Sequence, residues 1–291
     1  MNPQSIAERL WPGRDVGIEA LGGGITNRNF KITVDEGAYV LRVGGKDTGL
    51  LGIDRAVEHG ASLIAAKLGI GPEVVAFVEP EGWLVTRFLG GRPLPPEEMR
   101  RGENLERAAR TLRRLHDGPR VPGRFDSFRV VAAYAETAKA HGVRVPEAFA
   151  WAKPIADGIE RRRAGEPERP CHNDLLNANF IDQGDRLRIV DWEYAGMGDR
   201  FFDLANFSVN HDLGEAENET LLGAYFGEAG PADRDALRLM RFMSDFREAM
   251  WGVVQQGISD LDFDFVGYAD EHFARLQRTA ADPGFRAALA A

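Results

Sequence analysis

The pattern of hydrophobic and polar residues in the first third of the chain predicts several strands and one helix. Residues 29–34 and 38–43 are rich in β-forming side chains and flank a polar turn that contains glycine, which is typical of a hairpin. Residues 55–68 repeat apolar side chains with a period near 3.6, and a run of glycine and proline ends this predicted helix. Residues 74–78 and 83–88 predict two further strands. This part of the chain is therefore expected to be rich in sheet.

Beyond this region the pattern changes from strands to helices. The glycines and prolines of residues 90–96 predict a hinge. Apolar side chains at helical spacing predict a helix around residue 110 and two more at residues 146–163 and 233–256. Two short strands, 179–182 and 187–190, are predicted between the last two helices.

These elements together predict an α+β fold with two lobes. Residues 1–89 form the small β-rich N-terminal lobe, and residues 90–291 form the larger helical C-terminal lobe. A chain of 291 residues is long enough for each lobe to bury a core.

Composition and charge narrow the possible functions. The net charge of −9 argues against a general nucleic-acid binder and mildly favours a cationic small-molecule substrate. The single cysteine, Cys171, rules out a disulfide within the chain and a cysteine-rich metal site. Neither a signal-peptide pattern nor an apolar run of membrane-spanning length is found, so a cytoplasmic protein without a membrane partner is expected. The sequence predicts no oligomeric state.

Three oxygen-bearing side chains near the predicted strands 179–182 and 187–190 form a candidate chemical centre. Asp174 and Asn179 lie five residues apart, and Asp191 follows Asp174 by 17 residues. A hairpin between the two strands would bring these side chains together. One Asp can accept a proton from a hydroxyl group, and the Asn and the second Asp are hard oxygen ligands that suit Mg²⁺. Taken singly, each residue is more typical of a turn cap or a strand end, whereas the joint spacing is that of a kinase catalytic loop.

The residues around this centre resemble the choline/ethanolamine kinase family, which belongs to the aminoglycoside-phosphotransferase-like kinases. Residues 171–180 and 189–206 carry the resemblance, which extends over about residues 21–276. It implies a protein-kinase-like fold with ATP as co-substrate and Mg²⁺ as cofactor. It also assigns roles to four residues: catalysis to Asp174, Mg²⁺ binding to Asn179 and Asp191, and support of the catalytic loop to Asp203.

Two neighbours of the catalytic loop are expected to have structural roles. His172 matches a loop histidine of the family that is mainly structural. Cys171 lacks the general base that a nucleophilic cysteine needs, so it is interpreted as a buried packing residue.

The N-terminal lobe, residues 1–89, is expected to bind the nucleotide. Glycines at 22–24 precede the predicted hairpin and allow backbone N–H groups to approach phosphates, although such a cluster is also typical of a flexible turn. The resemblance assigns this loop to the ATP phosphates. The polar contacts it implies are Thr26, Asn27 and Asn29.

A cation on the second hairpin strand, Arg42, takes the place of the lysine that protein kinases use to hold phosphates. Its guanidinium can bind phosphate oxygens bidentately, and Glu58 on the following helix is its expected partner. The alternative is that both residues face solvent. Residues 86–89, with Thr86 and Phe88, are expected to run beside the adenine.

The C-terminal lobe, residues 90–291, is expected to bind the acceptor as well as to carry the catalytic centre. A quaternary ammonium is recognised by aromatic faces and nearby negative charge. The resemblance implies an acceptor site built from Glu193, Tyr194, Trp251, Phe263 and Tyr268, although aromatic residues at helical spacing are also typical of a core.

Two positions depart from the family pattern. Glu248 stands where a tryptophan is found in eukaryotic choline kinases, and Asn210 stands where they have a glutamate. Glu248 can supply negative charge to the acceptor site in place of the aromatic ring.

The predicted function is ATP- and Mg²⁺-dependent transfer of the γ-phosphoryl group to the hydroxyl of a small amino alcohol, most plausibly choline or ethanolamine. A related kinase that acts on thiamine, an aminoglycoside, a sugar or another hydroxyl compound is the main alternative. A catalytically silent nucleotide-binding module is a third possibility. The intact set of Asp174, Asn179 and Asp191 argues against it.

Overall fold

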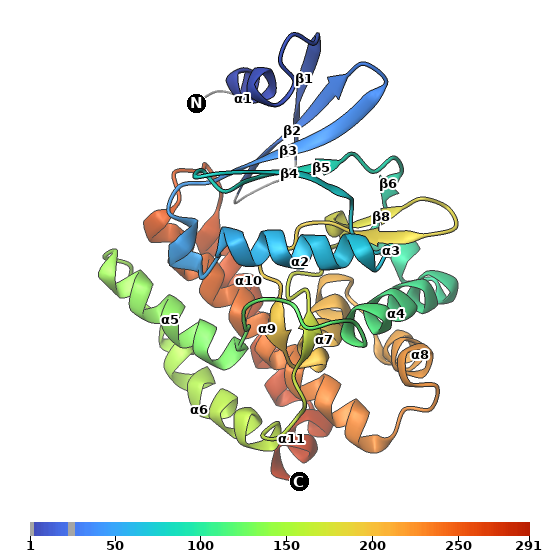
Figure 1. The fold of residues 1–291 in the computed structure, drawn as a ribbon. Coiled ribbons are helices and arrows are strands. Elements are labelled where there is room, and N and C mark those ends of the chain that lie inside the picture. The colour runs from blue at the N-terminus through green and yellow to red at the C-terminus, as the bar shows by residue number, and fades with distance from the viewer. Residues whose placement is uncertain (1–2, 23–26) are drawn as a thin grey trace.

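The computed structural model describes residues 3–22 and 27–291. An antiparallel five-stranded sheet, ordered β1-β2-β3-β5-β4, forms the upper part of the molecule in Figure 1. Its β2 and β3 pair from Val34 and Gly37 at the turn, which confirms the predicted hairpin. The strands are β1 (Val16–Leu21), β2 (Asn27–Val34), β3 (Gly37–Gly44), β4 (Val74–Val78) and β5 (Trp83–Arg87).

The sheet has a small core of its own. Helix α1 (Pro3–Leu10) buries Ile6 and Ala7 against apolar side chains of the sheet. The strand residues in this cluster are Ile32, Val34, Leu41, Val43 and Val85. Burial of these side chains is the main favourable contribution to this layer.

Helix α2 (Arg55–Lys67) lies between the sheet and the helices below it (Figure 1). Asp54 caps it by accepting the backbone N–H groups of Ala56 and Val57. Its buried apolar residues Ala61 and Ala65 belong to the large core of the helical part rather than to the core of the sheet. The predicted division of the chain at residues 89 and 90 stays a prediction.

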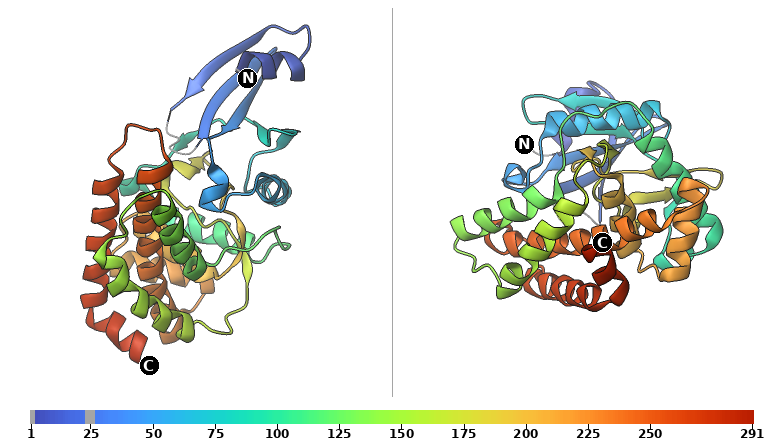
Figure 2. Two further views of the ribbon diagram at one scale, coloured as in Figure 1. Left: turned by 90° about the vertical axis from the view of Figure 1, so that its left-hand side faces the viewer. Right: turned by 90° about the horizontal axis from the view of Figure 1, so that it is seen from below.

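The helical part is organised around α9 (Pro231–Ile258). This long helix contacts α5, α7 and α10, and most of its residues are buried. Burial along most of its length places α9 at the centre of this core, although its buried residues include the charged Asp245, Arg247 and Glu248. The surrounding helices, seen from two further sides in Figure 2, are α4 (Gly102–His116), α5 (Ser127–Ala140), α6 (Glu147–Arg162), α7 (Arg200–Asn210), α8 (Glu215–Phe226), α10 (Phe265–Ala281) and α11 (Pro283–Ala290). The helices predicted around residue 110 and at 146–163 and 233–256 are confirmed, as is the α+β class.

Short strands connect the two parts. β8 (Phe180–Asp182) pairs with β9 (Leu187–Ile189) as predicted, although Asn179 belongs to the preceding 3-10 turn η2 (Asn177–Asn179). β6 (Arg92–Pro93), within the predicted hinge, pairs with β8. Gly91 is needed there, because its φ is +121° and a Cβ would lie 2.2 Å from the Asp182 carbonyl oxygen.

The remaining elements are short. They are η1 (Thr48–Leu51), α3 (Pro96–Met99), and the antiparallel pair β7 (Arg169–Cys171) and β10 (Gly196–Gly198). Within residues 3–22 and 27–291, no helix combines the length and apolarity needed to cross a membrane.

Candidate functional site

The loop that follows β7 is positioned by hydrogen bonds to the carboxylate of Asp203. Asp203 on α7 accepts the backbone N–H of His172 at 2.8 Å and that of Asn173 at 2.6 Å. Asn173 has a φ of +66°, so the chain turns sharply before Asp174. The His172 ring is buried and lies 3.0 Å from the Val190 carbonyl through Nε2. The geometry agrees with the supporting roles expected for His172 and Asp203.

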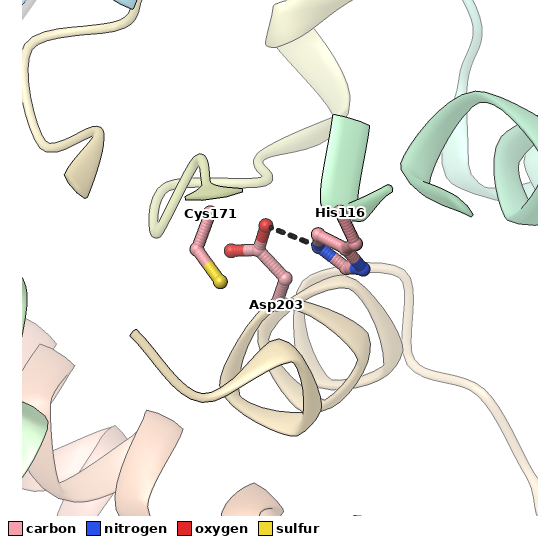
Figure 3. Close-up of side chains that lie close together, drawn as sticks. All are labelled: His116, Cys171 and Asp203. Carbon is pink, nitrogen blue, oxygen red and sulfur yellow. Dashed lines mark hydrogen bonds and ion pairs between the residues drawn. The ribbon is translucent and has the colours of Figure 1, made fainter. Parts of the chain in front are cut away.

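Asp203 is itself positioned by a buried polar cluster, drawn in Figure 3. Nε2 of His116 lies 3.0 Å from an Asp203 carboxylate oxygen, a contact that Figure 3 marks. Nδ1 of the same ring lies 2.6 Å from the Tyr225 hydroxyl. Cys171 also belongs to this cluster, because its Sγ lies within 4.8 Å of a ring nitrogen of His116 and of a carboxylate oxygen of Asp203. Burial raises the pKa of the Cys171 thiol well above its usual value, so the thiol is neutral. Both oxygens of Asp203 already accept backbone N–H groups, so this cluster is interpreted as a support for the loop rather than a metal centre.

Asp174 lies at the tip of this loop with 13% of its side chain exposed. Burial raises its pKa to about 8, against the opposing effect of the Arg247 guanidinium 3.5 Å away. The Asn179 amide nitrogen donates to the Asp174 backbone carbonyl at 2.9 Å. This bond leaves the amide oxygen of Asn179 as its atom for a metal ion, which fits the expected role.

Asp191, directly beyond β9, faces the sheet. One of its oxygens lies 2.7 Å from Nη1 of Arg42, and the same nitrogen lies 2.6 Å from Glu58. The structure therefore brings Arg42 and Glu58 together as the sequence predicts. Burial opposes the charge of Arg42, but the carboxylates of Asp191, Glu58 and Glu193 outweigh it and raise the pKa of this guanidinium. The carboxylate of Asp191 is therefore in a position to interact with a positive group, here the Arg42 guanidinium.

A second set of contacts joins Glu193 to the N-terminal sheet and α2. Its carboxylate accepts hydrogen bonds from Asn27 at 2.8 Å and from Arg55 at 3.0 Å. Arg55 also contacts Glu58 at 2.7 Å and Asn27 at 2.9 Å. Burial, and next the charge of Asp191, raise the pKa of Glu193 to about 7. Glu193, expected in the acceptor site, thus lies in the same network as the nucleotide-site residues Asn27 and Glu58.

A cavity of about 370 Å³ opens between the sheet and β8. Most of the expected nucleotide and metal residues line it. They are Asn29, Arg42, Glu58, Thr86, Phe88, Asn179 and Asp191. Thr26 lies outside the described residues. Apolar walls that the sequence did not single out include Leu21, Pro72, Leu84 and Trp192. Apolar walls beside charged groups at one end suit a nucleotide base and its phosphates.

An aromatic group is formed by Trp251 on α9, Tyr268 on α10 and Phe263 in the segment between these helices. Trp251 packs edge-on against Tyr268, with ring centroids 5.4 Å apart, and Phe263 lies 6.0 Å from Tyr268. The Tyr268 hydroxyl donates to Glu248 at 2.9 Å. Phe263 is 41% exposed, whereas Trp251 is buried. Four of the six expected acceptor residues are therefore neighbours, and their binding role stays a prediction.

Arg247, which the sequence analysis did not select, joins this group to Asp174. Its guanidinium contacts both Asp174 and Glu248 and lies 4.3 Å from the centroid of the Tyr194 ring. Burial opposes ionisation of Glu248, but Arg247 beside it holds the pKa of this carboxyl below its usual value. Phe265, 5.8 Å from Trp251, was also missed.

Comparison with known proteins gives consistent results. The sequence profile of the phosphotransferase enzyme family matches residues 17–240. Protein LicA of Haemophilus influenzae is 26% identical over an alignment of 246 positions that covers 80% of this chain and 72% of that protein. A probable ethanolamine kinase of Arabidopsis thaliana is 24% identical, with 86% of this chain and 76% of that protein covered.

Solved structures share the fold. A choline/ethanolamine kinase family protein from Mesorhizobium loti has a TM-score of 0.84 and 33% identity, with 99% of this chain and 97% of that chain covered. Choline kinase LicA from Streptococcus pneumoniae has a TM-score of 0.82 at 22% identity, with 96% and 97% covered, and shows the fold alone. The expected kinase-like fold is confirmed. The profile match over most of the chain and the near-complete overlap with the Mesorhizobium protein show that this chain belongs to the choline/ethanolamine kinase family, whose members are ATP-dependent phosphotransferases with an alcohol group as acceptor.

Proposed function

We propose that the protein transfers the γ-phosphoryl group of ATP to the hydroxyl of a small amino alcohol, choline or ethanolamine, in a Mg²⁺-dependent reaction. The observation that carries this proposal is the position of Asp174. Its carboxylate contacts Arg247, which joins it to the aromatic group, and its backbone carbonyl accepts a hydrogen bond from Asn179, which lines the nucleotide cavity together with Asp191. An acceptor bound at the aromatic group and a nucleotide bound in this cavity would meet at the Asp174 carboxylate.

The residues of the chain have separate tasks in this reaction. Asp174 accepts the proton of the acceptor hydroxyl as its oxygen attacks the phosphorus, and the bond to ADP breaks. Arg42, oriented by Glu58, faces the phosphate end of the cavity. Asn179 and Asp191 would hold Mg²⁺, which neutralises phosphate charge when it is bound with the nucleotide.

The amino-alcohol acceptor is supported by the names of the relatives and by the chemistry of the site. The relatives include ethanolamine kinases and a choline/ethanolamine kinase family protein. Trp251 and Tyr268 offer aromatic rings that attract an ammonium group, and the buried carboxylate of Glu248, which is paired with Arg247, accepts a hydrogen bond from Tyr268.

A screen of ATP consumption tests the proposal. Purified protein with Mg²⁺ is assayed with choline, ethanolamine, thiamine, an aminoglycoside and small sugars. We expect kcat/KM for choline or ethanolamine to exceed that of the other acceptors by about tenfold or more, since one well-placed charged contact contributes this much. Preference for an aminoglycoside or thiamine would replace the proposed acceptor, and activity that persists after EDTA treatment would refute the Mg²⁺ requirement.

Replacement of Trp251 by alanine tests the aromatic acceptor site. The KM for the ammonium acceptor is expected to rise about tenfold, because an ammonium that faces a desolvated ring gains about 2 kcal/mol. The KM for ATP should change little. Trp151→Ala, at an exposed tryptophan on α6, is the matched control. Equal changes in both KM values would show that Trp251 only packs the core.

Replacement of Arg42 by alanine tests the nucleotide side. We expect kcat/KM for ATP to fall by about 100-fold, the effect of losing one positioned donor to a charged group. Arg28→Ala, at an exposed position on the neighbouring strand β2, removes the same charge and should leave ATP kinetics unchanged. Unaltered ATP kinetics in Arg42→Ala would remove this residue from the nucleotide site.

Replacement of His116 by alanine tests the support beneath the catalytic loop. Without the contact to Asp203, the loop should lose its position, and kcat should fall by about 10- to 100-fold while both KM values stay close to wild type. Tyr225→Phe, which removes only the outer hydroxyl, should have a smaller effect on kcat. A lower melting temperature with unchanged kcat would mean that the cluster is only structural.

A further inference from the structure

A second cavity, of about 420 Å³, lies between α4 and the β8–β9 hairpin, outside the nucleotide cavity. The described lining residues of the two cavities do not overlap. Four arginines contribute to this surface: Arg107, Arg110, Arg114 and Arg186. Arg188 on β9 lies beside them. We call this group of five the arginine cavity.

The spacing of these residues explains why they gather. Arg107, Arg110 and Arg114 follow each other at intervals of three and four along α4, so they share one helix face. Arg186 immediately precedes β9, and Arg188 follows two positions later within this strand. α4 contacts β9, so the two rows face a common space.

The positive charge of the arginine cavity is only partly neutralised. Arg107 pairs with Asp182 at 2.6 Å, and weaker pairs join Arg110 to Glu106 at 3.3 Å and Arg186 to Asp185 at 3.4 Å. Over residues 3–22 and 27–291, neither Arg114 nor Arg188 has a carboxylate partner within ion-pair distance. The five arginines thus outnumber the three acids that pair with them, in a protein with a net charge of −9.

Arg188 is also incompletely hydrogen-bonded. Its Nη2 donates to the Gly71 carbonyl at 2.6 Å, but its Nε is buried and has no partner among the described residues. Burial lowers the pKa of Arg188, and the charges of Arg186 and Arg114 lower it further. Crowded like charges are costly, and an anion in the cavity would relieve this repulsion.

We propose that the arginine cavity binds a small anion that carries one or more phosphate groups. Guanidinium groups match phosphate oxygens with paired N–H donors, and the cavity has the size of a small-molecule site. The proposal does not depend on the acceptor of the kinase reaction.

Calorimetric titration with sodium pyrophosphate tests the proposal. The protein is first saturated with ADP so that the nucleotide cavity is filled. We expect saturable binding with one pyrophosphate per chain. The double variant Arg114→Gln/Arg188→Gln should bind at least about tenfold more weakly, since each lost charge-assisted contact contributes about 1.5 kcal/mol or more. Its affinity for ADP should be unchanged.

Two further variants distinguish a specific binding site from nonspecific electrostatic attraction. Arg120→Gln/Arg144→Gln removes the same charge from exposed positions elsewhere and should bind pyrophosphate as wild type does. Arg110→Gln/Arg114→Gln alters only exposed arginines and provides the test if the first variant does not fold. Non-saturable binding, or equal weakening in the control, would overturn the proposal. A parallel titration with inorganic phosphate separates the ligand classes, because tighter binding of pyrophosphate assigns a diphosphate group and equal binding assigns a single phosphate.

Discussion

Replacement of Asp174 by asparagine is expected to lower kcat by about 1,000-fold, within the range that one proton-accepting group contributes. The change keeps the size and the polar contacts of the side chain but removes its ability to take a proton. ATP binding should persist, because Asn179 and Asp191, which line the nucleotide cavity, remain in place. The measurement is a steady-state assay with the preferred acceptor, together with calorimetric titration of a non-hydrolysable ATP analogue.

The stability of this variant provides an internal control. Burial disfavours the charged form of Asp174, so a neutral amide at this position should leave the melting temperature equal to or above that of wild type. Asp212→Asn, at an exposed position, is the matched substitution and should have wild-type kinetics. Near-normal turnover by Asp174→Asn would exclude this residue as the proton acceptor.

Replacement of Arg247 by methionine is expected to impair both stability and catalysis. The guanidinium is fully buried and neutralises the buried carboxylate of Glu248. Loss of one partner of such a pair costs about 3–5 kcal/mol, which corresponds to a decrease in melting temperature of about 10 °C. Since Arg247 also lies 3.5 Å from Asp174, kcat should decrease as well.

A double variant separates these two effects. In Arg247→Met/Glu248→Gln the uncompensated charge is gone, so most of the lost stability should return, while kcat should stay low because Asp174 still lacks its neighbour. Thermal melting and kinetics of both single variants and the double variant complete the cycle. Recovery of kcat together with stability would show that Arg247 acts only as a counter-charge.

Features of this protein that depend on short stretches of sequence could be predicted. The hairpin of β2 and β3 follows from alternating side chains and a polar turn. Arg42 lies on strand β3, and Glu58, 16 residues later, lies on α2, the next α-helix along the chain. The predicted contact between them is therefore one between neighbouring elements. The grouping of Asn179 and Asp191 in one cavity follows from the β8–β9 hairpin.

Contacts between distant segments were less accessible from the sequence. Glu193 follows Asp191 by two residues and was therefore expected near the acceptor. Its partner Arg55, however, lies 138 residues away in the sequence, on α2. Arg247 was missed because a charged side chain on a helix normally faces solvent. Only the packing of α9 at the centre of the helical part shows that this position is buried.

The placement of α2 has a mechanical consequence. This helix contributes its apolar residues to the large core, whereas the sheet and α1 enclose a separate one. A tilt of the sheet away from α2 would therefore leave both apolar cores intact. The contacts broken by such a tilt would mainly be the stacking of His59 against Phe77 and the polar bonds of Asn27 and Arg42. Water can replace polar bonds of this kind one by one, so the nucleotide cavity can widen without partial unfolding of either core.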